Sequence, residues 1–526
     1  MKHATEPVDL NVEALQGLLE RAKVAPLKEA DYQALRAALA TLGNLRQLLE
    51  DRKTTLARLR QILFGASTEK TRAVLNTNPG AKTGPQGNEE NRASAEQKRK
   101  GHGRNGAQAY PGATKITIRH ASLTSGDTCP ECQQGKVYAA TTPGYRVRLV
   151  GQAPIGASVY ELEKLRCNLC GEVFTAREPE DVGAQKYAAS SASMIALLKY
   201  GSGFPFHRLE RLQESLGIPL PASTQWAIVE ESAGVVKPAY EELIRQAAQG
   251  EVLHNDDTPM KILALMGEHA EEGDAVASRT GIFTSGIVST REKRQIALFF
   301  TGHPHAGENL AEVLRRRASE LGPPIQMCDA LSRNLPGELA SLVANCLAHG
   351  RRKFVEVAQS FPDECRHVLE TLGEVYQNDA LTHGMSREAR LGFHQARSAP
   401  MMEGLEKWLR ERLAQRQVEP NSGLGKAIAY MITHWEKLTL FLRVPGAPLD
   451  NNLCERALKK AILHRKNALF YKTENGASVG DVFMSLIHTC QLCHVDPLDY
   501  LTTLHKHTEE VARNPQAWMP WNYLQS

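Results

Sequence analysis

Leucines recur at every seventh position in the N-terminal part of the chain, at Leu35, Leu42, Leu49, Leu56 and Leu63. This interval is the d-position pattern of a coiled coil. The facing a positions are mixed, because Tyr32 and Leu39 suit a coiled-coil seam whereas the next three are charged. We therefore predict a leucine-rich coiled coil over residues 1–72 that brings copies of the chain together. One long amphipathic helix packed on its own protein is the alternative.

The hydrophobic pattern is lost over residues 73–115, where Asn, Gly, Pro, Gln and Lys dominate. Such a segment cannot bury a core and is typical of a flexible basic linker. Farther along, a helical pattern occupies residues 179–249. Within it, one helix ends at Gly217 and a second begins at Ser223, after Pro221. This layout is typical of a helix-turn-helix, with an ordinary helical hairpin as the alternative.

After Gly250 the pattern changes from helical to strand-like. We predict strands over 251–254, 280–289 and 295–301, a helix over 307–321, a short strand ending at Asp329, another helix, and a strand over 344–348. This succession is typical of a ribonuclease H-like α/β catalytic domain, whose first and fourth strands are neighbours. Its two parts would be residues 250–350 and 445–475, with an all-helical insertion over 351–444 and a helical C-terminal element over 476–526. The chain is therefore predicted to be a multidomain α+β protein.

Composition narrows the function classes only a little. The chain has 526 residues, enough for several domains, but its net charge of +4 is too small to prove a nucleic-acid partner. The first residues lack an apolar signal region, and no stretch approaches a membrane-spanning length. We expect a cytoplasmic, nucleoid-associated protein of bacterial type. In that compartment the cysteines are reduced thiols or metal ligands.

Two Cys-x-x-Cys pairs indicate a metal site, formed by Cys129, Cys132, Cys167 and Cys170. Two such pairs complete a tetrahedral Zn²⁺ site that is closed by sulfur and is therefore structural. Residues 145–150 and 159–162, between the pairs, alternate as strands do, so we predict a zinc ribbon over 116–178. Cys490 and Cys493 share the local spacing but lack a second pair, and we predict that they are buried free cysteines.

Three acidic residues, in the right order, indicate the chemistry of the predicted catalytic domain. Asp256 closes one apolar run, Asp329 follows another, and Glu455 returns on a helix after the long insertion. Carboxylates in this arrangement can hold two Mg²⁺ or Mn²⁺ ions, which clamp the attacking and leaving oxygens of a phosphoryl transfer. Each acid alone has a simpler explanation as a surface or capping carboxylate. Their joint placement is what favours the metal site.

Basic residues follow the third acid. No acidic residue lies between Arg456 and Lys472, and the candidate nucleic-acid contacts there are Arg456, Lys459, Lys460, Arg465 and Lys466. A run of one sign suits a polyanion, and Phe470 and Tyr471 would add a surface that grips a strand. A solvated helix face is the alternative. At the predicted helix-turn-helix, the second helix begins with Ser223, Thr224 and Gln225, which could reach base edges or phosphates.

At these residues the chain resembles the large transposase of the insertion-sequence-sixty-six family, within the DDE transposases. The resemblance covers nearly the full length, and residues 63–70, 256–259, 348–354 and 450–456 carry it. It implies that Asp256 inherits a catalytic role and Asp257 does not. Asp257 stands where the family usually has Glu, His464 stands where it usually has Gly, and the residues around Asp329 differ from the commoner form.

The resemblance implies a DNA transposase that cuts the ends of an insertion sequence and joins them to target DNA. The three acids would be catalytic and hold Mg²⁺ or Mn²⁺, while Zn²⁺ would be structural. His349, Arg351 and Arg352 are candidates for positioning phosphate, with helix capping and surface solvation as the alternative. Expected partners are double-stranded DNA, further copies of the chain in a homodimer or higher oligomer, and small accessory proteins. Two other functions stay open: a non-catalytic or domesticated DNA-binding protein, and a ribonuclease H-like structure-specific nuclease.

Overall fold

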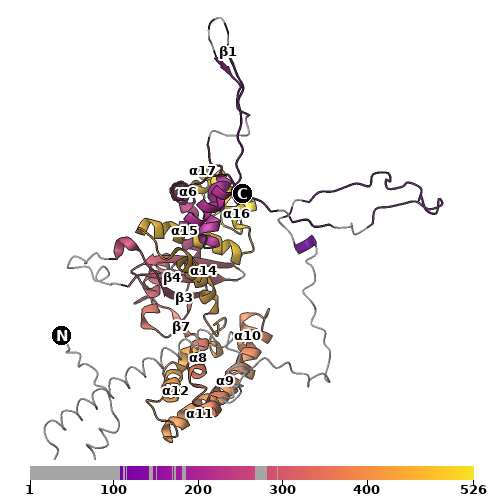
Figure 1. Ribbon diagram of the computed structural model, residues 1–526. Helices are drawn as coiled ribbons and strands as arrows, with labels where there is room; N and C mark the ends of the chain where they lie inside the picture. Colours follow the sequence, from indigo (N-terminus) through magenta and orange to yellow (C-terminus); the bar gives the residue numbers. More distant parts are fainter. Residues whose placement is uncertain are drawn as a thin grey trace, which may run out of the picture. The chain divides into compact units, whose positions relative to one another are not determined.

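The computed structural model describes residues 107–179, except 110–112, 114, 141–145, 150, 167, 169 and 171–172, and residues 185–525, except 267–280 and 293. The predicted coiled coil over 1–72 and nearly all of the predicted linker lie outside the described residues. The described chain is a mixed α and β structure with one five-stranded sheet, one two-stranded sheet and many helices (Figure 1). None of its helices is long and apolar enough to cross a membrane.

The chain divides into two compact units. Among the described residues, the first contains Met327–Ala330 and Val343–Asn451 and is here called the helical unit. The second contains the remainder and is called the sheet unit. The division passes through the fourth and fifth strands of the main sheet, so each of these strands has residues in both units.

The five strands of the main sheet follow the order β5-β4-β3-β6-β7. They are β3 (Val252–Pro259), β4 (Phe283–Arg291), β5 (Arg294–Gly302), β6 (Ile325–Cys328) and β7 (Leu342–Asn345). β3 and β5 each pair antiparallel with β4. The Ile325 amide donates to the Glu251 carbonyl at 2.9 Å, so β3 and β6 begin together and run in the same direction. The prediction that the first and fourth strands are neighbours is confirmed.

The connections between these strands depart from the sequence-based prediction. The helix α7 spans Ala306–Leu314 and is shorter than expected, and α8 (Leu347–Val357) begins within the segment predicted as the last strand. Between β6 and β7 there is no second helix but a 3₁₀ turn, η4 (Ser332–Asn334). Pro336 and Gly337 follow this turn, and Gly337 has a φ of +65°. Proline and a left-handed glycine both stop a helix, which explains the difference.

Helix α15 (Glu474–Leu492) covers the edge strand β5 through a ladder of hydrogen bonds. Asp481, Ser485 and Thr489 accept from the amides of Thr301, Phe299 and Ala297 at 2.7, 2.9 and 3.1 Å. Residues four positions apart lie on the same face of a helix, and the amides of residues two positions apart point to the same edge of a strand. Three successive positions on the helix face therefore meet three successive amides of the strand edge. The ladder satisfies donors that an edge strand otherwise leaves open. Burial raises the pKa of the Asp481 carboxyl to about 7.

Further helices complete the sheet unit. The longest, α6, has 27 residues and packs against β4, β5 and α15. Its buried Val236 and Leu243 join Leu253, Ile287 and Phe483 in one hydrophobic core. The helices of the unit not yet given bounds are η1 (Ala107–Ala109), α4 (Ala189–Ala196), the π-helical η2 (Leu197–Gly201), α5 (Phe206–Ser215), α6 (Ala222–Ala248), η3 (Leu263–Leu265), α14 (Asn452–Ala468), α16 (Pro497–Lys506), α17 (Thr508–Arg513) and η6 (Tyr523–Gln525).

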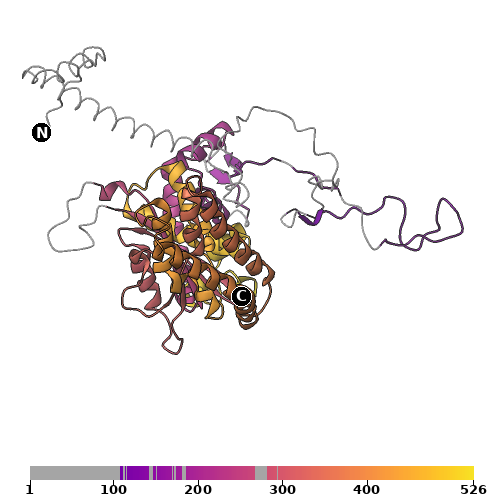
Figure 2. The ribbon, with the colours of Figure 1, turned by 90° about the horizontal axis from the view of Figure 1, so that it is seen from below.

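The helical unit consists of packed helices (Figure 2). Helix α8 packs against its neighbours α9 and α12, and α11 packs against α9, α10 and α12. An ionic cluster joins α9 to α10, because Asp379 accepts from Arg390 at 2.7 Å and lies 3.1 Å from the His394 ring. The bounds are α9 (Pro362–Leu381), α10 (Arg387–Arg397), α11 (Ala399–Ala414), α12 (Gly423–Thr433), α13 (Trp435–Leu438) and η5 (Leu440–Leu442).

Candidate active site

Asp256 lies in the second half of β3, and its orientation follows from strand pairing. It pairs with Gly286 of β4. Directly paired residues of antiparallel strands point to the same face of a sheet. A Cβ added at Gly286 would lie 2.9 Å from Leu458 Cδ2 and 3.4 Å from Cys454 Sγ, so α14 covers that face. The Asp256 side chain therefore points to the face that carries α14.

Glu455 belongs to the first turn of α14, which is fixed at this strand position. Its neighbour Cys454 is buried, and the Cys454 thiol donates to the Gly286 carbonyl at 3.2 Å. The glycine is needed for this approach, since any side chain at 286 would collide with Leu458. The sheet unit thus brings the start of α14, with Glu455, beside the strand pair that carries Asp256.

Asp257 points to the opposite face, and two residues that sequence reasoning missed hold it there. Its buried carboxylate lies 2.8 Å from His305 Nδ1 and 3.2 Å from Arg333 Nη2. The Asp257 amide donates to Asp256 Oδ1 at 2.8 Å, so the anchored residue also orients its neighbour. Phe283 packs against the His305 ring at 4.4 Å. His305 lies 48 residues after Asp257, and no local pattern links the two.

The cavity beside this ionic group is open to ligand-sized molecules. Its volume is about 880 Å³, and its lining includes His305, Glu308, Asn309, Arg315 and Arg333. Both basic and acidic side chains line the cavity. Its contribution to the site is that Arg333 reaches solvent while remaining bound to Asp257.

Asp329 directly follows β6 and belongs to the helical unit. Its backbone carbonyl accepts from Asn345 Nδ2 at 3.2 Å. Burial, helped by the Asp329 charge, raises the pKa of the Tyr430 hydroxyl to about 12. Since β3 and β6 run in the same direction, Asp256 and Asp329 both lie toward the carboxyl ends of neighbouring strands.

Helix α8 carries the residues predicted to position phosphate: His349, Arg351 and Arg352. The start of this helix is fixed by the segment that precedes α14. The Leu347 amide donates to the Leu449 carbonyl at 2.9 Å, and the Asn451 amide donates to Cys346 Sγ at 3.2 Å. The three predicted residues are partly buried.

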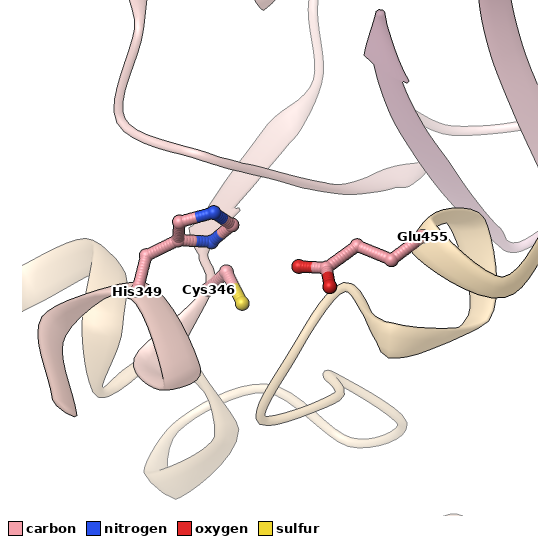
Figure 3. A group of neighbouring side chains, drawn as sticks. All are labelled: Cys346, His349 and Glu455. Carbon is pink, nitrogen blue, oxygen red and sulfur yellow. The ribbon is translucent and has the colours of Figure 1, made fainter. Parts of the chain in front are cut away.

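Cys346, His349 and Glu455 form a group that could hold a metal ion, because their ligand atoms all lie within 4.8 Å of one another. Figure 3 shows the three side chains directed toward a common space. The described part of the chain has no other group of this kind, and only one of the three predicted acids belongs to it. Sulfur and nitrogen donors favour softer ions than Mg²⁺, so this set by itself is not a magnesium site. Sequence spacing gave no indication of Cys346.

The basic run lies mainly on α14. Arg456, Lys459 and Lys466 are exposed, whereas Lys460 and Arg465 are half-buried. Burial lowers the pKa of the Lys460 ammonium. Arg465 Nη1 donates to Thr258 Oγ1 at 3.0 Å and to the Pro259 carbonyl, which ties the run to β3. Three of the five predicted contacts are therefore openly available to a polyanion.

Two residues predicted to contact nucleic acid are buried instead. Tyr471 is enclosed, and its ring stacks on His464 at 4.6 Å. Gln225 is fully buried, and its Nε2 donates to the carbonyls of Leu220 (2.8 Å) and Phe206 (3.2 Å). Gln225 thus fixes the turn between α5 and α6, and only Ser223 and Thr224 at the start of α6 are accessible. Both predictions were wrong because a polar or aromatic residue has the same local pattern whether it faces inward or outward.

The first cysteine pair adopts a tight turn suited to a metal. The Cys129 amide donates to the Gly135 carbonyl at 2.7 Å, and the Gly135 amide donates to Cys132 Sγ at 3.4 Å. Hydrogen bonds from the backbone at Gln134 and Gly135 and from Cys129 lower the pKa of the Cys132 thiol.

Of the second pair, Cys170 is described and exposed, and Cys167 lies outside the described residues. The antiparallel strands β1 (Lys164–Arg166) and β2 (Val173–Thr175) flank this pair. The predicted strands over 145–150 and 159–162 were wrong where the structure describes them, because residues 146–149 and 159–162 are not paired. The strands that the structure describes in this region are β1 and β2 instead. By contrast, Cys490 is buried in α15, and burial raises its pKa well above the usual value.

Comparison with known proteins matches residues 185–479 to the family described as Transposase IS66 family. Two proteins of Sinorhizobium fredii, uncharacterized protein y4jD and uncharacterized protein y4hP, are 26% and 24% identical to this chain over 351 and 387 residues. The matches cover 63% and 69% of this chain, and 65% and 67% of the two relatives. Uncharacterized protein y4qI of the same organism is 30% identical over 195 residues, which are 34% of each protein. The chain thus spans slightly under two thirds of the length of y4jD.

Proposed function

Since the chain belongs to the IS66 family of transposases, we propose that it is a DDE transposase with a ribonuclease H-like catalytic domain. In this proposal it cuts strands at the ends of an insertion sequence and transfers them to target DNA. The family match supports this, because residues 185–479 include Asp256, Asp329 and Glu455. The observation that carries the proposal is the packing of α14, whose first turn contains Glu455, on the sheet face to which Asp256 points.

The residues of the site fit a divalent ion with oxygen ligands. Asp256 lies within β3, Asp329 follows the neighbouring strand β6, and Glu455 lies in the first turn of α14. Carboxylate oxygens are ligands that Mg²⁺ and Mn²⁺ prefer. When bound, such ions would stabilise the attacking and leaving oxygens of the phosphodiester. We assign the holding of these ions to Asp256, Asp329 and Glu455.

Other residues would orient the acids and the DNA. The Asp257 amide donates to Oδ1 of the Asp256 carboxylate and so would help to orient that acid. His349, Arg351 and Arg352 would position phosphate from α8. Ser223 and Thr224 at the start of α6, the basic face of α14, and a zinc ribbon held by Cys129, Cys132, Cys167 and Cys170 would bind the element ends.

The decisive experiment is strand cleavage and joining on labelled duplexes that carry the inverted repeats flanking the gene, with Mg²⁺ or Mn²⁺. The unmodified chain should cut and join, while Asp256→Ala and Glu455→Ala should each lower the rate by about a thousandfold or more, as expected when an ion-holding group is lost. Glu509→Ala, which removes an exposed carboxylate of α17, serves as the matched control and should be fully active.

Each other result points to a different function. Specific DNA binding without cleavage, with accessory proteins supplied, would favour a non-catalytic or domesticated DNA-binding protein. Cutting by DNA structure, without dependence on end sequence and without joining, would favour a ribonuclease H-like nuclease. Cleavage that persists in both acid variants would show that these carboxylates are the wrong ones.

A further inference from the structure

Exposed apolar side chains gather where α14 ends. They are Leu263, Met266, Leu469 and Phe470, exposed by 42%, 55%, 62% and 41%, and they are here called the apolar ridge. Their two segments lie side by side. The Leu263 amide donates to the Tyr471 carbonyl, and the Tyr471 amide donates to the Lys261 carbonyl, both at 2.9 Å. Large exposed apolar side chains that gather in one place mark an interaction site.

The backbone at Leu469 is strained without any gain in burial. Its φ is +70°, in the left-handed region that favours glycine. Its amide closes α14 by donating to the Arg465 carbonyl at 2.9 Å, a position at helix ends where glycine is the common residue. The side chain is largely exposed, so it does not stabilise the core in return. Strain that folding does not explain is a reason to look for a function.

Phe470, the next residue, is held at the surface because Tyr471 after it is packed in the core. Tyr471 is buried, and its ring stacks on His464 at 4.6 Å. Phe470 directly precedes this buried tyrosine and is 41% exposed, so its side chain reaches solvent while Tyr471 points inward. Phe470 is therefore presented by a fixed backbone.

The charges around the ridge identify its partner. Lys261, Lys466 and Lys472 are exposed around it, and no acidic residue occurs between Arg456 and Thr473. These exposed cations fit the phosphates of a nucleic acid, and the acids nearest to the ridge in the sequence, Glu268 and Glu474, lie just outside the two segments that form it. Arg465 links this region to Thr258, which lies on the same face of β3 as Asp256. DNA held by these cations would thus lie near the candidate catalytic acids.

We propose that Leu469 and Phe470 press between bases of the bound DNA and unstack one base step next to the strand that is cut. Apolar side chains flanked by cations act in this way in proteins that kink or open a duplex. Leu263 and Met266 would support the displaced base, and the lysines would hold the phosphates on either side. This inference rests on the proposed function, because it names the DNA contact of the same site.

The test uses the full chain with Asp256→Ala, which blocks cleavage, and duplexes with 2-aminopurine at successive positions across the terminal repeat and its junction. Saturating protein should raise the fluorescence several-fold at one or two adjacent positions. Adding Leu469→Ala and Phe470→Ala together should abolish the rise while the duplex still binds. Phe470→Trp should keep it. Leu381→Ala, which removes a leucine of the helical unit that is 66% exposed, is the matched control and should change nothing.

A second variant distinguishes the role of the apolar ridge from that of the surrounding lysines. Lys466→Ala should weaken binding and reduce the salt dependence of the affinity by about one counterion, yet keep the full rise at saturation. A bound duplex with unchanged fluorescence, or a full rise in the Leu469→Ala and Phe470→Ala chain, overturns the inference. No binding of any duplex overturns the proposed function as well. A localised rise that the ridge variants abolish, combined with no cleavage by the unmodified chain, overturns only the catalytic proposal.

Discussion

Two adjacent carboxylates on β3 have different environments. Strand geometry sends Asp256 to the face covered by α14 and Asp257 to the face of α7. The Asp257 side chain is fully buried, and its carboxylate is bound by His305 and Arg333. Asp256 Oδ1 accepts a hydrogen bond from the Asp257 amide at 2.8 Å. Asp256, which resembles the family motif, and Asp257, which orients it, thus have different chemical roles.

Asp257→Asn should separate these two roles. The substitution replaces the buried carboxylate that binds His305 and Arg333 with a neutral amide. We therefore expect the free energy of unfolding to fall by about 1–3 kcal/mol. Cleavage should fall by roughly ten- to a hundredfold, because a shift of Asp256 weakens its alignment. Urea unfolding and single-turnover cleavage would measure both.

The matched change is Glu312→Gln, which removes an exposed partner of Arg315 and should cost less than about 0.5 kcal/mol. An Asp257→Asn chain as stable and as active as the Glu312→Gln chain would show that the ionic group has no positioning role.

At the scale of elements, glycine 286 allows α14 to lie close to β4. Gly286→Ala would place a Cβ 2.9 Å from Leu458 Cδ2 and 3.4 Å from Cys454 Sγ, so the Leu458 side chain or α14 itself would have to shift. We expect a loss of about 1–3 kcal/mol in the free energy of unfolding, as for other overpacked cores, together with reduced cleavage because Glu455 moves with the helix.

The comparison variant is Gly322→Ala, where an added Cβ meets nothing within 4 Å. Its free energy of unfolding should stay within about 0.5 kcal/mol of the unmodified chain. Equal stability of the two alanine variants in urea would show that α14 is not tightly packed at this strand.

The two Cys-x-x-Cys settings allow a direct test of the proposed zinc site. Cys132→Ser should abolish bound zinc in elemental analysis of the purified chain, because a tetrahedral site needs all four ligands. Cys493→Ser alters a pair with the same spacing, but Cys493 is half-buried and its thiol donates to the Gln295 carbonyl at 3.5 Å. The second variant should keep its zinc. Loss of zinc from Cys493→Ser, or retention by Cys132→Ser, would contradict the assignment.

At the scale of the whole molecule, the leucine heptad stays a prediction, because residues 1–72 lie outside the described residues. We propose that this segment pairs two copies of the chain, one for each element end. A chain that lacks residues 1–75 should have a smaller mass in light scattering and should pair DNA ends poorly, while it still binds divalent metal. An unchanged mass would refute the pairing role.

Local pattern determined much of the fold of the sheet unit. The apolar runs that end near Asp256 and Asp329 are strands β3 and β6, because a buried strand is marked by its own short run of apolar residues. The prediction that these two strands are adjacent in the sheet was confirmed. The family was also recognisable from sequence, since its blocks are short and local.

Only the tertiary structure decided which side chains meet and which are hidden. Gln225 and Tyr471 look available in the sequence, yet packing encloses both. His305 and Arg333 carry no signal of their link to Asp257, because that contact depends on how α7 and η4 fold against β3. The sequence by itself determined the approximate places of the five main-sheet strands, the order of the acids and the cysteine pairs. Burial and the meeting of distant residues required the fold, since they depend on packing between segments far apart in the chain.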